Sequence, residues 1–321
     1  MISGKGFMQM SIISVVLCTY NGEKYIKRQI ETILEQNPAP DEIIISDDGS
    51  TDGTLSIVNE LLAGEQDCKY IINRNQMNLG FVKNFQKALM LSEGDFIFFS
   101  DQDDEWMPNK TKTILAFFDD NPDIEMVFSD GRTIDSNGEE LDCNLWNSFG
   151  FGEKKQLREF HQNPLKFLLG KNIVTGATIA IRRSLINCII PFPTELVHDT
   201  WISYIAAIRG TLGIIELPLI RYRVHSNQTI GIKHGIKDSA LLKTDKTEEK
   251  CRLDKIYQYA KTNKYENESS LIKGKMDFYM SRDTLKSYGM FKRIAVVAGN
   301  WRNYYAYASG LYSMIKDIFI V

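Results

Sequence analysis

The sequence lacks paired cysteines and long apolar runs. Its five cysteines are odd in number, widely scattered and never in a C-x-x-C pair. Neither a disulfide framework nor a zinc site is therefore indicated, and a reducing cytosol is the expected compartment. Charged residues interrupt every window of the aromatic stretch 291–321 that is long enough to span a bilayer, so no transmembrane helix is expected. With 43% hydrophobic and 25% charged residues, the chain is neither disordered nor fibrous.

Glycine-rich phosphate loops are also missing. The sequence contains neither G-x-x-x-x-G-K-[S/T] nor G-x-G-x-x-G. The nucleotide-binding folds that hold phosphates in a glycine cradle are therefore disfavoured. The apolar run 12–17 is too short for a signal peptide and lacks a small-residue cleavage site, so it is interpreted as the first core strand.

Charge is distributed unevenly along the chain. Residues 1–232 contain 21 Lys and Arg against 31 Asp and Glu, a net −10, whereas residues 233–321 contain 17 against 10, a net +7. The two values sum to the −3 of the whole chain. The C-terminal part is therefore a different kind of segment, basic and rich in aromatic residues.

Apolar runs typical of buried strands alternate with segments of helical periodicity from the beginning of the chain. Strands are expected at 12–18, 42–46, 70–73, 95–100, 126–128, 178–182, 213–216 and 219–222. Helices are expected near 25–34, 54–62, 81–91, 109–118, 164–169 and 200–208. This order predicts an α/β fold with a mostly parallel sheet flanked by helices. We expect a catalytic domain at 1–231, with a donor-binding half at 11–120 and an acceptor half at 121–231, followed by a helical extension at 232–321.

Polar clusters follow three of the expected strands, at 18–22, 47–53 and 101–104. Asp, Ser and Thr before a helix are common caps, and a glycine there can simply serve a turn. Ligands of such sheets, however, bind beyond the carboxyl ends of the strands. Because three successive strands end in this way, the clusters are expected to converge on one crevice.

The segment Asp101-Gln102-Asp103-Asp104 is the most acidic of these clusters. Crowding carboxylates is costly unless a cation offsets their repulsion. Mg²⁺ or Mn²⁺ takes few protein carboxylates and completes its shell with water and phosphate oxygens. A divalent metal ion that binds a diphosphate is therefore expected here.

These segments together resemble the inverting glycosyltransferases of family 2, which have the GT-A fold. The resemblance extends from about residue 11 to 231 and depends on 15–21, 47–54, 78–81 and 100–106. The later pieces 172–176, 198–201 and 222–225 resemble the rhamnosyltransferase-like branch. The implied activity is transfer of a sugar, with rhamnose as one candidate, from a nucleoside-diphosphate sugar to an acceptor hydroxyl in the synthesis of a surface polysaccharide or glycolipid.

The resemblance also implies roles for individual residues of the donor site. Tyr20 and Asp48 would hold the nucleobase, with Thr19 and Asp47 beside them. Asp101 would lie near the ribose and the metal. Asp103 would bind the metal directly, and His225 would complete the metal or diphosphate site. For His225 the alternative is an ordinary surface histidine.

Asp199 matches the catalytic base of the family, which takes the acceptor's proton in a single inverting displacement. It could also be a plain helix N-cap, or Glu195 could be the base instead. Trp201 would be an apolar platform for the acceptor, or simply a buried aromatic residue. Relatives in this branch often have an aromatic residue where Thr200 stands, so the acceptor pocket is expected to differ.

Two other functions remain open: a sugar-phosphate nucleotidyltransferase, and a non-catalytic protein that binds nucleotide sugars or glycans. A nucleotidyltransferase usually needs a basic, glycine-rich loop after the first strand, and this loop is missing. A non-catalytic binding protein is expected to have lost the acidic residues of the site, and these are present.

Residues 232–321 either pack on the catalytic domain or form a surface for an anionic membrane, where lipid-linked acceptors reside. The expected partners are the nucleotide sugar and a glycan or lipid-linked acceptor, and no nucleic acid is expected. The expected location is the cytoplasm, at the inner face of the plasma membrane if residues 232–321 bind the membrane.

Overall fold

The computed structural model describes residues 11–65, 67–226, 228, 246–308 and 310–319. Its residues group into two compact units. Unit 1 comprises the described residues within 1–145, 175–192 and 213–234, and unit 2 those within 146–174, 193–212 and 235–321. The predicted domain boundary between 231 and 232 lies outside the described residues.

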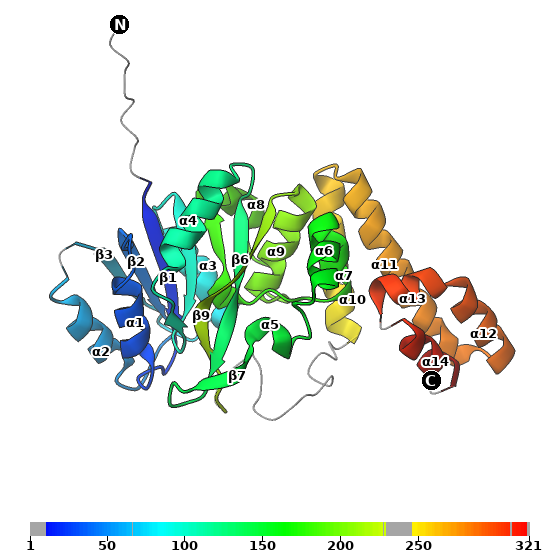
Figure 1. The fold of residues 1–321 in the computed structure, drawn as a ribbon, viewed down its shortest axis with the longest axis horizontal. Helices are drawn as coiled ribbons and strands as arrows, with labels where there is room; N and C mark the ends of the chain where they lie inside the picture. Colours follow the sequence, from blue (N-terminus) through cyan, green and yellow to red (C-terminus); the bar gives the residue numbers. More distant parts are fainter. Residues whose placement is uncertain (1–10, 66, 227, 229–245, 309, 320–321) are drawn as a thin grey trace, which may run out of the picture. The chain divides into compact units, whose positions relative to one another are not determined.

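Unit 1 is built on a mixed β-sheet (Figure 1). Its strands are β1 (Ile13–Thr19), β2 (Glu42–Asp47), β3 (Lys69–Arg74), β4 (Phe96–Asp101), β5 (Glu105–Trp106), β6 (Met126–Ile134), β7 (Glu140–Asn144), β8 (Ala180–Arg182) and β9 (Leu212–Arg223). They lie in the order β3-β2-β1-β4-β8-β6-β9-β5, and β7 pairs with β6. The first four strands pair in parallel, and β6 runs in the same direction because it pairs antiparallel with β8, which pairs antiparallel with β4. The predicted α/β class and mostly parallel sheet are confirmed.

Helices lie between the strands of unit 1 along the chain. They are α1 (Ile26–Leu34), α2 (Thr54–Leu62), α3 (Phe81–Leu91), α4 (Lys110–Asp120) and the short α8 (Ile186–Ile189). Every residue of β1 and β2 is buried, as expected for strands covered on both faces. The predicted helices 54–62 and 81–91 have the observed bounds.

The prediction was wrong at the end of the sheet. The two strands expected at 213–216 and 219–222 are one continuous strand, β9, that passes through Pro218. The next residue, Leu219, still accepts a hydrogen bond from the Met107 amide at 3.0 Å, so the missing N–H of the proline does not end the pairing. Strands β5 and β7 were not predicted: β5 has only two residues and pairs with the distant β9, and β7 is a short, polar strand that pairs with the preceding β6.

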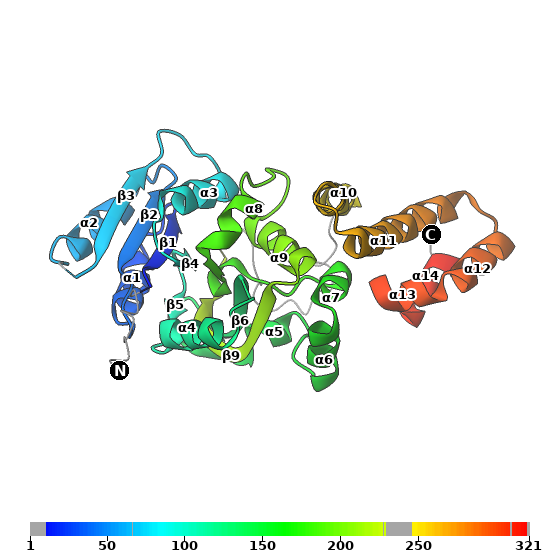
Figure 2. The same cartoon turned by 90° about the horizontal axis from the view of Figure 1, so that it is seen from above.

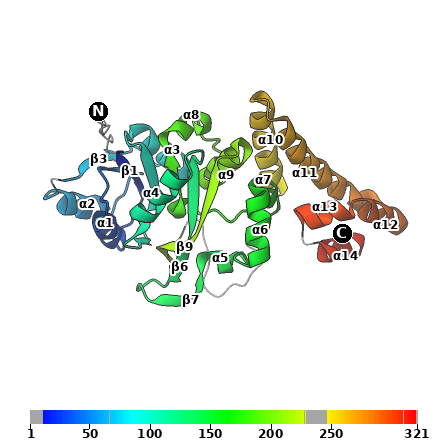
Figure 3. The same ribbon diagram turned by 45° about the horizontal axis from the view of Figure 1, so that its top comes forward.

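Unit 2 is helical (Figure 3). Its helices are α6 (Lys154–Gln162), α7 (Pro164–Gly170), α9 (His198–Arg209), α10 (Lys246–Thr262), α11 (Glu266–Thr284), α12 (Met290–Gly299), α13 (Trp301–Tyr307) and α14 (Leu311–Phe319), and α5 (Leu145–Ser148) precedes them. Within this unit α10 contacts α9 and α11 contacts α7. The predicted helical C-terminal extension is confirmed for the described residues after 245.

A buried polar contact ties the extension to the earlier helices of unit 2. The Lys275 ammonium donates a hydrogen bond to the Leu169 carbonyl at 2.6 Å and pairs with Glu249 at 3.4 Å. Burial lowers the pKa of Lys275 to about 8, and the attraction of Glu249 offsets only part of this cost of desolvation. No helix in the described part of the chain is long and apolar enough to cross a membrane.

Candidate functional site

Predicted site residues meet at one edge of the sheet in unit 1, where the parallel strands end. Thr19 lies opposite Asp47 across the β1–β2 pair, and Cys18 lies opposite Asp101 across the β1–β4 pair. The carboxyl ends of three neighbouring strands therefore bring Thr19, Asp47 and Asp101 together. This edge is where ligands bind in open α/β sheets.

Asp47 holds the turn that follows β2. Its buried carboxylate accepts hydrogen bonds from the amides of Ser50 at 2.9 Å and Gly49 at 3.2 Å. It also accepts a bond from the Thr19 hydroxyl at 3.0 Å, which joins the ends of two strands. These bonds give Asp47 a role in shaping the loop, and its contact with a nucleotide stays a prediction.

Asp48 performs a similar task for a second loop. Its buried carboxylate accepts hydrogen bonds from the Leu79 amide at 2.8 Å, the Gly80 amide at 2.9 Å and the Asn75 side chain at 2.9 Å. The 78–80 segment is one of those that resemble the family. Asp48 therefore positions this segment beside the strand ends, and its contact with the nucleobase stays a prediction.

Tyr20 is held by Gln102, a residue of the predicted 101–104 cluster for which no role was predicted. The side-chain amide of Gln102 accepts a hydrogen bond from the Tyr20 amide at 2.8 Å and donates one to the Tyr20 carbonyl at 3.1 Å. The Tyr20 side chain is 49% exposed. Gln102 thus fixes the backbone from which an accessible aromatic ring projects.

Gly22 leaves the space that Gln102 occupies, because a Cβ on Gly22 would lie 2.2 Å from Gln102 Oε1. Gly22→Ala should displace the amide and break both of its bonds to Tyr20. We expect a loss of about 1–3 kcal/mol in the free energy of unfolding, measured by urea denaturation. In a Gln102→Ala background the same substitution should cost much less. Equal costs in the two backgrounds would contradict this coupling.

Asp103 and His225 meet although they are far apart in the sequence. The distance from Asp103 Oδ2 to His225 Nε2 is 2.8 Å. The two side chains are 18% and 11% exposed. The His225 ring also lies 5.0 Å from the ring of Tyr25. The structure therefore joins two of the three predicted metal ligands in a partly accessible pair.

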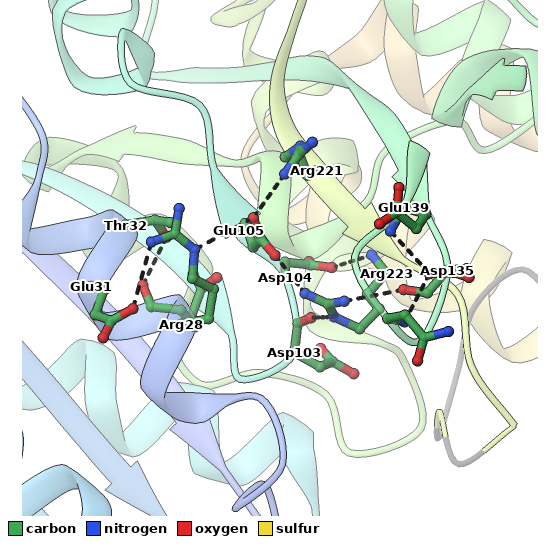
Figure 4. Close-up of polar contacts among 12 residues, drawn as sticks. Arg28, Glu31, Thr32, Asp103, Asp104, Glu105, Asp135, Glu139, Arg221 and Arg223 are labelled. Carbon is green, nitrogen blue, oxygen red and sulfur yellow. Dashed lines mark hydrogen bonds and ion pairs between the residues drawn. The ribbon is translucent and has the colours of Figure 1, made fainter. Parts of the chain in front are cut away.

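Arg223 connects the acidic loop to β9 (Figure 4). Its guanidinium donates to the Asp103 carbonyl at 2.7 Å, to Glu105 Oε1 at 2.7 Å and to the Asp135 carbonyl at 3.1 Å. Its backbone amide donates to Asp104 Oδ1 at 2.8 Å. This buried clamp explains how Asp103 is held opposite His225. Position 223 appeared in the sequence only as part of a family-like segment, with no signal of this role.

Burial and neighbouring charges shift the pKa values of buried groups near the acidic loop. Desolvation, with repulsion from Asp103 and Asp101, raises the pKa of the buried Asp104 well above its usual range. Desolvation likewise lowers the pKa of Lys110 to about 7 against the attraction of these acids. The Lys110 ammonium donates to the Ala177 carbonyl at 2.8 Å. Burial, with Asp101 and Asp48 nearby, raises the pKa of Cys18, so this thiol is expected to be unreactive.

The donor atoms of this cluster fit a divalent ion only in part. Carboxylate oxygen and imidazole nitrogen suit Mn²⁺ and, through the carboxylates, Mg²⁺. In the described part of the chain, however, no three His, Cys, Asp or Glu side chains are arranged to hold a metal. Asp103 and His225 could therefore hold an ion whose remaining ligands come from water and phosphate oxygens. A contribution of Asp101 to this site stays a prediction.

Asp199 lies in unit 2, in the first turn of α9. The helix begins at His198 with Val197 at the N-cap, so the N-cap alternative for Asp199 is wrong. The Thr200 hydroxyl donates to Asp199 at 3.1 Å and accepts from the Asn172 side chain at 3.0 Å. Asn172 and Thr200 therefore orient the Asp199 carboxylate.

The other acceptor candidates also have partners in unit 2. Trp201 is buried and lies edge-on to Tyr259, with ring centroids 5.9 Å apart. Glu195 forms an ion pair with Lys255 at 3.3 Å. The roles of Trp201 as an acceptor platform and of Glu195 as an alternative base stay predictions.

His198 should make the stability depend on pH, because burial lowers its pKa from 6.5 to about 3. The unfolded chain binds a proton at this residue below about pH 6.5, whereas the folded chain does not until near pH 3. The free energy of unfolding should therefore fall as the pH drops through this window, by up to about 1.4 kcal/mol per unit. Urea denaturation between pH 6.5 and 5 should give a smaller slope for His198→Leu than for the parent. The control His161→Leu, at an exposed position, should keep the parental slope, and equal slopes for all three would refute the assignment.

Comparisons with known proteins agree with this geometry. The sequence profile of the family described as Glycosyl transferase family 2 matches residues 14–189. An uncharacterised glycosyltransferase of Haemophilus influenzae is 27% identical over 69% of this chain and 68% of its own. One of Methanocaldococcus jannaschii is 28% identical over 68% of this chain and 73% of its own.

A solved structure shares the fold. The crystal structure of Staphylococcus aureus TarS residues 1–349 in complex with UDP-GlcNAc superposes with a TM-score of 0.58 at 17% identity, and the match covers 96% of this chain and 81% of TarS 1–349. Such a likeness supports the GT-A architecture. Because the family profile covers more than half of the sequence, the chain belongs to glycosyl transferase family 2 and is a glycosyltransferase of that type.

Proposed function

We propose that this glycosyltransferase is metal-dependent and inverting, and that it transfers a sugar from a nucleoside-diphosphate sugar to an acceptor hydroxyl. The observation that carries the proposal is the Asp103–His225 pair at 2.8 Å, on the acidic loop that follows β4. Thr19, Asp47 and Asp101 lie at the ends of the neighbouring strands. Tyr20, with its exposed ring, would contact the nucleobase.

Asp103 and His225 would hold Mn²⁺ or Mg²⁺ together with oxygens of the diphosphate. Lewis-acid stabilisation of the departing diphosphate is the chemistry that such an ion supplies when bound. Arg223 keeps the Asp103 backbone in place through its bond to the Asp103 carbonyl. The loop would thus meet the donor without a large rearrangement, which keeps the cost of organising the site low.

Asp199 is proposed as the base. The acceptor oxygen forms a bond to the anomeric carbon while the bond from that carbon to the phosphate oxygen breaks, and the hydroxyl proton passes to the Asp199 carboxylate. One displacement of this kind inverts the anomeric centre. The hydrogen bond from Thr200 orients the carboxylate for this step.

The choice of donor and acceptor to test follows from the proteins that this chain resembles. The TarS complex contains UDP-GlcNAc, so a uridine diphosphate sugar is a reasonable first donor, and a rhamnose donor follows from the branch resemblance. The acceptor is proposed to be a glycan or lipid-linked sugar in the cytoplasm. Family membership argues against the nucleotidyltransferase alternative.

The test is to incubate the protein with candidate nucleoside-diphosphate sugars and Mn²⁺ and to measure released nucleoside diphosphate. Release that stops in excess EDTA is the expected result. Nuclear magnetic resonance of the product should show an anomeric configuration opposite to that of the donor. Binding of a donor without release, for every acceptor tried, would favour a non-catalytic nucleotide-sugar-binding protein.

A further inference from the structure

Helix α12 places its apolar side chains toward solvent. Met290, Phe291 and Ile294 are exposed, and Phe291 is 87% exposed. With Ala295 and Ala298 they form one stripe at helical spacing. The buried residue of the helix is Val297, which borders this stripe at i+7 from Met290 and packs within unit 2. Helix α12 therefore buries one apolar residue and leaves its larger apolar side chains, Met290, Phe291 and Ile294, exposed to solvent.

Helix α14 goes further, because the residues that it buries are polar. Its buried residues are polar, Ser313 and Asp317, whereas the exposed ones include Leu311, Tyr312 and Ile315. Phe319, at the end of the helix, is 67% exposed. Helices α12 and α14 contact one another, so the two apolar stripes belong to one packed group of helices (Figure 2).

An ion pair of the buried Asp317 with the partly exposed Arg282 fixes which side of α14 faces inward. The Asp317 carboxylate accepts hydrogen bonds from the Arg282 guanidinium at 2.8 Å and from the Tyr304 hydroxyl at 2.7 Å. Turning α14 to bury its apolar stripe would break both hydrogen bonds to Asp317 and leave the partly buried Arg282 without this partner. The exposure of the stripe is therefore enforced by contacts inside unit 2.

The positive charge of this part of the chain indicates which kind of partner could cover the apolar stripes. Residues 285–321 contain five Lys and Arg and one acid, a net +4, and that acid is the buried Asp317. The exposed cations in this part of the chain include Lys292, Arg302 and Lys316. A second copy of the chain would bring like charges together, whereas an anionic surface would neutralise them.

The aromatic residues fit a lipid–water interface. Trp301 and Tyr305 on α13 and Tyr312 on α14 are exposed, and α13 contacts α14. Trp and Tyr prefer the headgroup region of bilayers, where an apolar ring and a polar atom are both accommodated. Helices of nine and ten residues are too short to span a bilayer but long enough to lie in its surface.

We propose that α12 and α14, with Trp301 and Tyr305, form a surface that docks on an anionic lipid bilayer. The apolar stripes enter the headgroup boundary while Lys292, Arg302 and Lys316 pair with lipid phosphates. This docking goes beyond the proposed reaction, and it needs neither donor nor metal. Failure of either proposal therefore leaves the other intact.

The test is sedimentation of the full chain with phosphatidylcholine vesicles that contain or lack phosphatidylglycerol. The protein should bind the anionic vesicles, bind the neutral ones weakly, and come off as salt rises, because the attraction is screened over about 10 Å at 0.1 M. The double variant Lys292→Gln with Lys316→Gln should bind the anionic vesicles about 25-fold more weakly, at about fivefold for each cation. The matched control Lys154→Gln with Lys166→Gln, at exposed positions of α6 and α7, should bind like the parent.

A second variant tests the apolar contribution. Phe291→Ser with Phe319→Ser should weaken vesicle binding at least about tenfold, while the thermal unfolding midpoint changes little because both rings are exposed. Met77→Ser in unit 1, at an exposed position, is the control. Equal recovery from neutral and anionic vesicles would overturn the proposal. A second result would also overturn it: a parental protein that is a dimer in light scattering and does not bind vesicles, together with a Phe variant that is a monomer.

Discussion

Asp103→Asn should lower turnover by about 10³-fold or more and sharply weaken metal-dependent binding of the donor. The substitution removes one of two paired donor atoms that could hold the cation, and Lewis-acid stabilisation of a leaving diphosphate is worth several kcal/mol. Asn is nearly isosteric and can still hydrogen-bond to His225, so the loop should keep its shape. Release of nucleoside diphosphate measures turnover, and titration with Mn²⁺ at fixed donor measures the binding.

The control for this experiment is Asp123→Asn, which removes an exposed carboxylate elsewhere in unit 1. Its turnover and metal response should equal those of the parent. His225→Gln should resemble Asp103→Asn in the metal titration, because either change leaves a single protein ligand. Full parental activity in excess EDTA would contradict the metal assignment, whatever the variants do.

The parallel half of the fold could be predicted because its signals are local. Each buried strand is a short apolar run followed by a helical period, and α2 and α3 were predicted to the residue. Parallel strands end at a common edge, so the convergence of Thr19, Asp47 and Asp101 follows from the order of the elements alone.

Contacts over long sequence separations could not be predicted in this way. Gln102 reaches Tyr20 only because β1 and β4 are neighbours in a particular register. Arg223 clamps Asp103 from 120 residues away, through a strand that appeared broken at Pro218. Both residues belong to segments that were singled out from the sequence, 101–104 and 222–225, but spacing in the sequence does not show which backbone atoms their side chains bind.

The C-terminal helices illustrate a different limit. The sequence of α14 shows two distinct faces, but periodicity does not say which of them is buried. The usual rule places the apolar face inside, and here Arg282 and Tyr304 reverse it by binding Asp317. The sequence therefore shows that this segment is basic and aromatic. Which of its faces is exposed could be learned only from the residues that bind the buried Asp317 carboxylate.

Asp199→Asn separates a catalytic base from a carboxylate that only stabilises a helix. Asp199 lies in the first turn of α9, where a negative charge is worth about 0.3–1 kcal/mol, so the variant should stay within roughly 1 kcal/mol of the parent in stability. Asn can keep the bond from the Thr200 hydroxyl.

The chemistry should respond far more strongly than the stability. Asn cannot take the acceptor's proton at neutral pH, so kcat should fall by about 10²- to 10⁴-fold, the usual worth of a positioned base. Donor affinity should barely change, since this carboxylate is assigned to the acceptor. Glu195→Gln is the matched comparison, because Glu195 is a nearby acid in the same unit that is already paired with Lys255. If Glu195→Gln carries the loss while Asp199→Asn turns over at the parental rate with unchanged stability and donor affinity, then Glu195 is the base and Asp199 serves only the helix.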